Sequence, residues 1–172
     1  MKKKYHTFIS GETIDLVIPN DYAIKFDNWW NWFNDEDTTK FLGSHGIFVN
    51  TVKKQKKILK EMIKKNESKT GLFLLIKPKK LNKVVGITSF SRLDLINKTA
   101  VLALVLNKNK TVDENFIYYG FEAKALMTMH GFEKFHLQKI EGGQALDLSE
   151  WQKFNILFGF RPNGLSESNF VK

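Results

Sequence analysis

The stretch LVLNKNKTVDENFIYYG, residues 104–120, decides the fold that this chain predicts. Its apolar start, Leu104 to Asn107, indicates the end of a strand, and a polar turn follows. An amphipathic helix begins near Phe116 and carries Gly120 in its first turns. A helix that begins directly after a strand presents unpaired backbone N–H groups, and such groups bind phosphate.

The same alternation continues to the end of the chain. Leu137 to Glu141 indicates the next strand, and Trp151 to Phe158 a second helix that ends at Gly159-Phe160. A strand–helix–strand unit pairs its strands in parallel. We therefore expect a parallel pair here and a possible short strand after Arg161.

The preceding residues predict more short strands and two helices. A helix at Tyr22–Phe33 follows from aromatic residues at three- and four-residue intervals, and Val52–Lys65 has the pattern of an amphipathic helix. Short turns between apolar runs favour antiparallel pairing. The fold class is therefore α/β: one domain, residues 1–172, with a mixed, mostly antiparallel sheet and helices on both faces. The remaining strands are expected at Thr13–Ile18, Leu72–Ile76, Val84–Phe90 and Thr99–Leu106.

Composition excludes several classes of protein. The chain is 42% hydrophobic, so it has enough apolar material for a core. Its net charge of +9 comes almost entirely from Lys, whereas Arg is preferred for nucleic-acid contacts, so we expect no nucleic-acid partner. The absence of cysteine removes disulfides and thiolate catalysis. No run approaches the roughly 20 apolar residues of a membrane span, so we expect a cytoplasmic protein.

The order and spacing of these segments resemble the GNAT superfamily of N-acetyltransferases. Gly11–Leu16, followed by an aromatic helix and Asn34-Asp35, is similar to the opening of the branches that acetylate ribosomal proteins and nucleotide sugars. Val85-Gly86-Ile87 resembles a strand of that family, and Lys139–Glu141 stands at the usual spacing before Gly159-Phe160. The resemblance implies acetyl-CoA as co-substrate and a primary amine as acceptor.

The family binds coenzyme A with a Q/R-x-x-G-x-G/A loop at the start of the helix that follows its fourth strand. Asn115–Gly120 is the best match, but Tyr118 stands in place of the first glycine. A ring there would crowd the pyrophosphate unless it points outward. The resemblance implies that the cofactor contacts come from Leu104, Leu106, Asn107, Lys108, Lys110, Tyr118, Tyr119, Gly120 and Phe121.

Two polar residues are the catalytic candidates. Asn155 stands where many relatives carry a tyrosine acid, and an amide can donate a hydrogen bond but cannot supply a proton. Glu141 lies where several relatives place a carboxylate, so it could act as a base through one water. The alternative for Glu141 is an exposed carboxylate at a sheet edge.

The acceptor side is expected to come from the N-terminal helices. Of the three tryptophans at 29, 30 and 32, at least one should be exposed or line a cleft, because together they span the helix circumference. Asn34 and Asp35 could hold the amine, or could simply form a turn that ends a helix. The acceptor candidates are Trp32, Asn34, Asp35 and His45.

Two functions remain open at this point. The first is N-acetyl transfer to an amino sugar nucleotide or a protein N-terminal amine, and the second is a catalytically degenerate binding or assembly module of the same shape. The four histidines show no metal-ligand spacing, so we expect no metal. The short tail after Gly164 leaves a sheet edge that a second subunit could cover, as in a homodimer.

Overall fold

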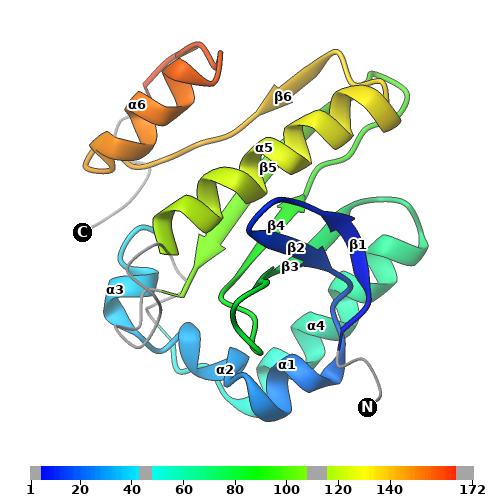
Figure 1. The fold of residues 1–172 in the computed structure, drawn as a ribbon, viewed down its shortest axis with the longest axis vertical. Coiled ribbons are helices and arrows are strands. Elements are labelled where there is room, and N and C mark those ends of the chain that lie inside the picture. The colour runs from blue at the N-terminus through cyan, green and yellow to red at the C-terminus, as the bar shows by residue number, and fades with distance from the viewer. Residues whose placement is uncertain (1–4, 43–47, 108–115, 166–172) are drawn as a thin grey trace.

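The structure, a computed structural model, describes residues 5–42, 48–107 and 116–165. Those residues form one mixed α/β unit, so the predicted fold class is confirmed. Figure 1 shows the elements and their labels. In chain order they are β1 (Thr7–Ser10), β2 (Ile14–Val17), α1 (Asp21–Phe26), α2 (Trp29–Trp32), α3 (Glu36–Thr39), α4 (Val52–Glu67), β3 (Leu72–Pro78), β4 (Gly86–Phe90), β5 (Thr99–Leu106), α5 (Phe116–Lys134), β6 (Lys139–Glu141) and α6 (Ser149–Leu157).

The strands follow one another across the sheet in sequence order, from β1 to β6. Each neighbouring pair from β1 to β5 is antiparallel. Most of these strands are joined by short turns, and the longer connection from β2 to β3 through α1–α4 returns the chain to the same end of the sheet. The crossover through α5 makes β5 and β6 parallel. The mostly antiparallel, mixed sheet is therefore as the sequence predicts.

Helices cover both faces of this sheet. Alternate residues of β3 point to opposite sides: Leu74 packs in a core with Met127 of α5, whereas Leu75 packs in a second core with Leu59 of α4. The second core also contains Trp29 of α2. The long α5 runs along β5, while α1, α2 and α4 gather on the other side (Figure 1). The first five residues of β3, Leu72 to Ile76, are all apolar because this part of the strand is buried on both faces.

The single helix predicted at Tyr22–Phe33 is wrong. The chain breaks between α1 and α2, where Asn28 adopts a left-handed conformation with φ of 53°, which Asn tolerates better than most residues. Asp27 turns inward and accepts hydrogen bonds from the Tyr5 hydroxyl at 2.7 Å and the Val84 N–H at 3.0 Å. The break changes which side chains face the core. Phe26 is therefore 63% exposed, although it belongs to the aromatic pattern that predicted one helix.

Three smaller differences concern short elements. β1 was not predicted, because its residues are mostly exposed and lack an alternating apolar pattern. Asp35, which was expected to hold the amine or to end a helix in a turn with Asn34, begins a further short helix, α3, as its N-cap. The short strand expected after Arg161 does not form within the described residues, which end at 165.

Candidate active site

The two parallel strands separate after a short stretch of pairing. The last matched pair is Val101 of β5 with Glu141 of β6, and β5 continues to Leu106 without a partner on that side among the described residues. The Val101 carbonyl accepts from the N–H of Ser91, and the Asn107 N–H donates to the carbonyl of Val85, so their peptide groups face the side of β4, which these two partners flank. Because peptide groups alternate along a strand, those of Leu104 and Leu106 face away from β4, toward the gap. We call Leu104–Leu106 the open edge of β5.

The exposure of β5 agrees with this geometry. Ala103 is exposed, and the side chains of Leu104 and Val105 are only partly buried, although the strand pairs along its other edge with β4. A strand inside a fully packed sheet would be buried along its length, as β3 and β4 are. The open edge therefore offers backbone donors and acceptors together with apolar side chains.

Helix α5 follows the open edge and begins at Phe116. Its first turn holds no acidic side chain that could compete with a bound anion at the N–H groups. The first N–H groups of an α-helix have no partner within the helix itself. Lys108 and Lys110 lie outside the described residues.

The predicted cofactor residues at the start of α5 take different positions. Tyr118 is 62% exposed, so its ring points away from the core. Tyr119 is 4% exposed and belongs to the core. Phe121 faces α6, where its ring stacks on that of Phe154 with centroids 4.0 Å apart.

Gly120 permits a close contact among three elements. A Cβ atom there would lie 2.7 Å from Leu106 Cδ1 and 2.9 Å from Trp151 Cη2. The glycine therefore lets Trp151 of α6 and Leu106 of β5 meet against α5. Its role in the described residues is packing at the end of β5, and a large side chain would displace α6.

One turn further along α5, three polar side chains form hydrogen bonds. They come from α5, from α6 and from the irregular segment between β6 and α6. The Lys124 ammonium donates to Asn155 Oδ1, and Asn155 Nδ2 donates to Gln144 Oε1 at 2.5 Å. The Lys124 Nζ atom also lies 4.2 Å from the centre of the Phe160 ring. We call Lys124, Gln144, Asn155 and Phe160 the Lys124 cluster. Burial lowers the pKa of Lys124 to about 8.

The Gly-Phe pair after α6 explains how Phe160 reaches Lys124. Gly159 has φ of 90°, and its N–H donates to the Ile156 carbonyl at 3.0 Å. The Phe160 N–H donates to the Asn155 carbonyl at 2.9 Å, which completes a Schellman motif. Only glycine adopts this conformation at little cost, so Gly159 turns the chain and returns Phe160 to the site.

Glu141 lies at the end of β6, beside the point where the strands separate. Its Oε1 atom forms an ion pair with Lys139 Nζ at 2.6 Å, and its side chain is 42% exposed. The two residues share one face of the strand because side chains alternate. Glu141 is therefore a partly exposed, ion-paired carboxylate at a sheet edge, close to the point where β5 and β6 separate.

Asn34 belongs to a network of amide groups on the other face of the sheet. Its side chain exchanges two hydrogen bonds, both of 2.8 Å, with the backbone of Asn50. Gln55 Nε2 donates to Asn50 Oδ1 at 3.0 Å, and the fully buried Trp29 donates from Nε1 to Gln55 Oε1 at 2.8 Å. We call Trp29, Asn34, Asn50 and Gln55 the amide network. It fixes α2 and α4 relative to each other.

The other acceptor candidates are also part of local structure. Asp35 is the N-cap of α3, and its Oδ1 accepts from the Thr38 N–H at 2.8 Å. Trp32 is 3% exposed and packs against Trp29, with centroids 5.4 Å apart. Trp30 is the partly exposed member of the three tryptophans. His45 lies outside the described residues.

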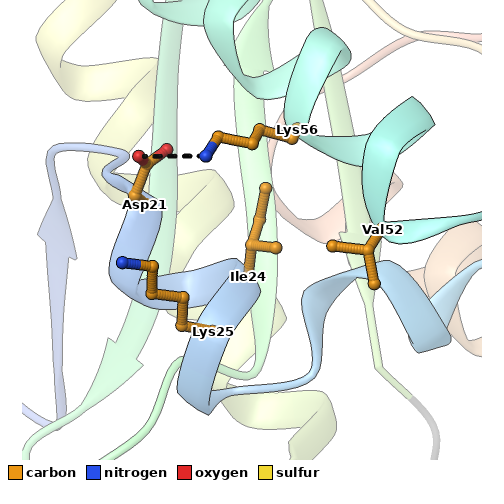
Figure 2. A pocket seen from close by; sticks show the side chains of 5 residues that line it. All are labelled: Asp21, Ile24, Lys25, Val52 and Lys56. Carbon is orange, nitrogen blue, oxygen red and sulfur yellow. Dashed lines mark ion pairs between the residues drawn. The ribbon is translucent and has the colours of Figure 1, made fainter.

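A small pocket between α1 and α4 contains none of these residues. It measures about 110 Å³ and is lined by Asp21, Ile24, Lys25, Val52 and Lys56. Figure 2 shows Lys56 directed toward Asp21, at an N–O distance of 3.8 Å. Pockets that enclose small molecules measure roughly 300 Å³ or more. This hollow is therefore too small to hold a coenzyme.

The described residues hold no group of three or more His, Cys, Asp or Glu side chains that could bind a metal ion. None of their helices is both long enough and apolar enough to cross a membrane.

Comparison with solved structures identifies the fold. RimL, the ribosomal L7/L12 alpha-N-protein acetyltransferase, in complex with coenzyme A has a TM-score of 0.78 at 16% identity, over 96% of this chain and 90% of that one. Spermidine N-acetyltransferase from Vibrio cholerae, with coenzyme A and spermine, has a TM-score of 0.76 at 12% identity, over 94% and 88%.

A third similar structure is the microcin C7 self-immunity acetyltransferase MccE with acetyl-CoA and AMP, with a TM-score of 0.74 at 19% identity, over 94% of this chain and 88% of that one. No family model matches the sequence. No curated protein matches it either. The chain thus has the fold of the GNAT acetyltransferases, as the resemblance implied.

Lys124 and Gln144 were not among the predicted site residues. A signal for Lys124 was present, because it stands four residues after Gly120 and three after Phe121, and thus on the same face of α5. Gln144 lies in the irregular segment after β6, where no periodic pattern could assign it a neighbour.

Proposed function

We propose that this protein transfers an acetyl group from acetyl-CoA to a primary amine. The observation that carries the proposal is the open edge of β5 at the start of α5, in a fold shared with acetyltransferases that bind coenzyme A. The pantetheine arm has amide groups that can pair with the free peptide groups of Leu104 and Leu106, as another strand would.

The pyrophosphate of coenzyme A would bind at the N-terminus of α5. Backbone N–H groups and the helix dipole both favour an anion there. Asn107, Lys108 and Lys110 lead into this helix and would add polar or positive groups. The exposed ring of Tyr118 supports the proposal, because a ring that points outward leaves the backbone accessible. Tyr119, Gly120 and Phe121 would support the site from beneath through packing.

Acetyl transfer requires three things of the protein. The amine must lose its proton, because a free alkyl amine has a pKa of about 10. The oxyanion of the tetrahedral intermediate needs a donor, and a free N–H on the open edge can serve. The sulfur must leave, which is easier than for an alkoxide because a thiol has a pKa of about 8.5. Glu141 is the candidate base, acting through a water molecule.

The acceptor would approach from the side of α2 and α3. In that case Asn34 and Asp35 shape the wall through the amide network and the α3 cap, and Trp32 supports it from the core. The amine class is an amino sugar nucleotide or a protein N-terminal amine. RimL, by its name, acts on a protein, and the spermidine acetyltransferase acts on a polyamine.

A catalytically degenerate binding module is the alternative. Two observations favour it: Asn155 stands at the position of the tyrosine acid, and Trp151 packs against Gly120. Both make the region less similar to the active site of a GNAT acetyltransferase. Such a protein would share the fold and lack turnover.

Calorimetry followed by an amine screen separates these functions. Acetyl-CoA is titrated into the protein, and thiol release is then followed with amino sugar nucleotides and with peptides that carry free N-termini. Saturable binding with amine-dependent thiol release supports the transferase. Binding without release from any amine supports the module, and no binding at millimolar acetyl-CoA contradicts the proposed use of this ligand.

A further inference from the structure

The Lys124 cluster differs from an ordinary surface contact because its cation has no anionic partner in the part of the chain that the structure describes. No carboxylate of the described residues lies within ion-pair distance of Lys124 Nζ. The Lys124 ammonium contacts the Asn155 amide and the ring of Phe160, and the Asn155 amide in turn donates to the Gln144 amide. All three are neutral at every pH of interest. The cluster therefore orients a positive charge without neutralising it.

The position of the cluster relates it to the open edge of β5. Gly120, Leu106 and Trp151 meet at the end of that edge. Lys124 follows Gly120 by one turn of α5, and Asn155 follows Trp151 by one turn of α6. One helical turn advances the chain by about 5.4 Å. Lys124 therefore stands one turn along α5 from the residue at which α5 meets the end of the open edge.

We propose that Lys124 is the proton donor to the sulfur atom that leaves acetyl-CoA, with Asn155 and Phe160 holding its ammonium group in place. This inference rests on the proposed function, because it places the thioester at the open edge. It assigns to Lys124 the task for which Asn155 lacks a proton. Lys124 counts as a catalytic residue in this assignment, and Asn155 and Phe160 as positioning residues.

The proposed reaction moves one proton from Lys124 to the leaving sulfur. The neutral amine attacks the carbonyl carbon, and the π electrons move to the carbonyl oxygen. When the carbonyl re-forms, the C–S bond breaks and its electron pair goes to sulfur, which takes a proton from Lys124 Nζ and becomes a thiol. The new amide nitrogen loses one proton to solvent, and the neutral Lys124 amine regains one from solvent.

The acidity of Lys124 suits this step. Burial lowers its pKa to about 8, which is close to the value of about 8.5 for a thiol. A proton donor is most effective when its pKa lies near the operating pH and near that of the group that it protonates. An ordinary lysine, with a pKa above 10, would give up its proton less readily.

A charge placed against the sulfur has a consequence that needs no acceptor amine. Free coenzyme A carries a thiol, and a nearby cation stabilises the thiolate. An opposite charge within about 4–6 Å lowers an acid's pKa by roughly 1 to 3 pH units. Bound coenzyme A should therefore have a thiol pKa lower by that amount than free coenzyme A.

The test measures this thiol pKa by the ultraviolet absorbance of the thiolate, with coenzyme A bound to excess protein. The chain contains no cysteine, so the thiolate signal comes from coenzyme A alone. The variant is Lys124→Met, which keeps an apolar stem over Phe160 and removes the charge. The control is Lys153→Met on α6, where Lys153 forms an exposed ion pair with Glu150.

We expect a lowered thiol pKa in the wild-type and Lys153→Met proteins, and a value near that of free coenzyme A in Lys124→Met. Equal thiol pKa values in all three proteins, with coenzyme A bound, would overturn the role of Lys124 while leaving the proposed function intact. If the wild-type protein fails to bind coenzyme A, it is the proposed function that fails.

A second measurement on the wild-type protein covers the case in which Lys124→Met does not fold. Nuclear magnetic resonance of isotopically methylated lysines follows the pKa of Lys124 with and without coenzyme A. By linkage, the thiolate must raise the pKa of Lys124 by the same amount that Lys124 lowers the thiol pKa. A rise with coenzyme A, and none with desulfo-coenzyme A, supports the inference. An equal response to both ligands contradicts it.

Discussion

The amide network and the Lys124 cluster join two helices each, but they differ in how their polar groups are used. In the amide network, Trp29, Asn34 and Gln55 form hydrogen bonds of 2.8–3.0 Å that hold backbone and core in one arrangement. In the Lys124 cluster, a charge lies between an amide and a ring, without an anion. The amide network is therefore suited to holding the fold rigid. The Lys124 cluster is suited to a charged ligand, as we propose.

The largest effect on stability is expected at Gln55, in the amide network. Gln55→Ala removes the acceptor of the buried Trp29 N–H and leaves a cavity beside α4. We expect a loss of about 3 kcal/mol in the free energy of unfolding, from the unpaired donor and the lost packing together. Urea denaturation measures it, with the exposed Gln138→Ala as the matched control. A loss below about 0.5 kcal/mol would mean that the network contributes little rigidity.

A smaller effect is expected where α5, β5 and α6 meet. Gly120→Ala places a Cβ atom within 3 Å of Leu106 and Trp151, and overpacking of this kind costs about 1–3 kcal/mol. Gly143→Ala is the control, because no atom lies within 4 Å of its added Cβ. Thermal unfolding of both variants gives the comparison. Equal melting temperatures would show that α6 does not pack tightly against Gly120.

The pH dependence of stability distinguishes the charged Lys124 cluster from the neutral amide network. The pKa of Lys124 is lowered from 10.5 to about 8, so the folded protein binds fewer protons than the unfolded chain between those values. Stability attributable to Lys124 should therefore rise between about pH 8 and pH 10.5. Lys124→Met should remove this rise and stabilise the protein at pH 7 by about 1 kcal/mol, after allowance for the exposed part of the side chain.

Urea midpoints of the wild type and Lys124→Met at pH 7 and pH 10 provide the measurement. If Lys124→Met is less stable than the wild type at pH 7 and shows the same rise, the ammonium group is a structural contact and is not held at a cost.

The smallest effect is expected at Tyr118. Its ring is 62% exposed, so Tyr118→Ala should change the free energy of unfolding by no more than about 0.5 kcal/mol. The affinity for coenzyme A should also stay within about threefold. A large gain in affinity on calorimetry would show that the ring obstructs the backbone at the start of α5.

Much of the fold was predictable because it follows apolar periodicity. The apolar runs in β3 and β5, the returning strand β4 and the stripe around Leu59 of α4 were predicted correctly, as was the crossover that makes β6 parallel. The break at Asn28 was not predictable, because the aromatic spacing continues across it. Only the tertiary contacts of Asp27 explain it.

The site was predictable in part. Leu104 and Leu106 were named from the resemblance to the GNAT superfamily, and the structure places both on the open edge of β5. The roles of Asn34 and Asp35 as a backbone clamp and a helix cap depend on partners that the sequence alone does not specify. Lys124 was missed because its environment is created by α6 and by the turn at Gly159, which are far from it in sequence.

Amide hydrogen exchange with and without coenzyme A tests the central claim most directly. The claim is that the peptide groups of Leu104 and Leu106 pair with the ligand beyond the point where β6 separates. We expect coenzyme A to slow exchange of these two amides markedly and to leave Leu74 in β3 unchanged. Unchanged exchange at Leu104 and Leu106 with saturating coenzyme A would contradict the assignment of the open edge as the binding site.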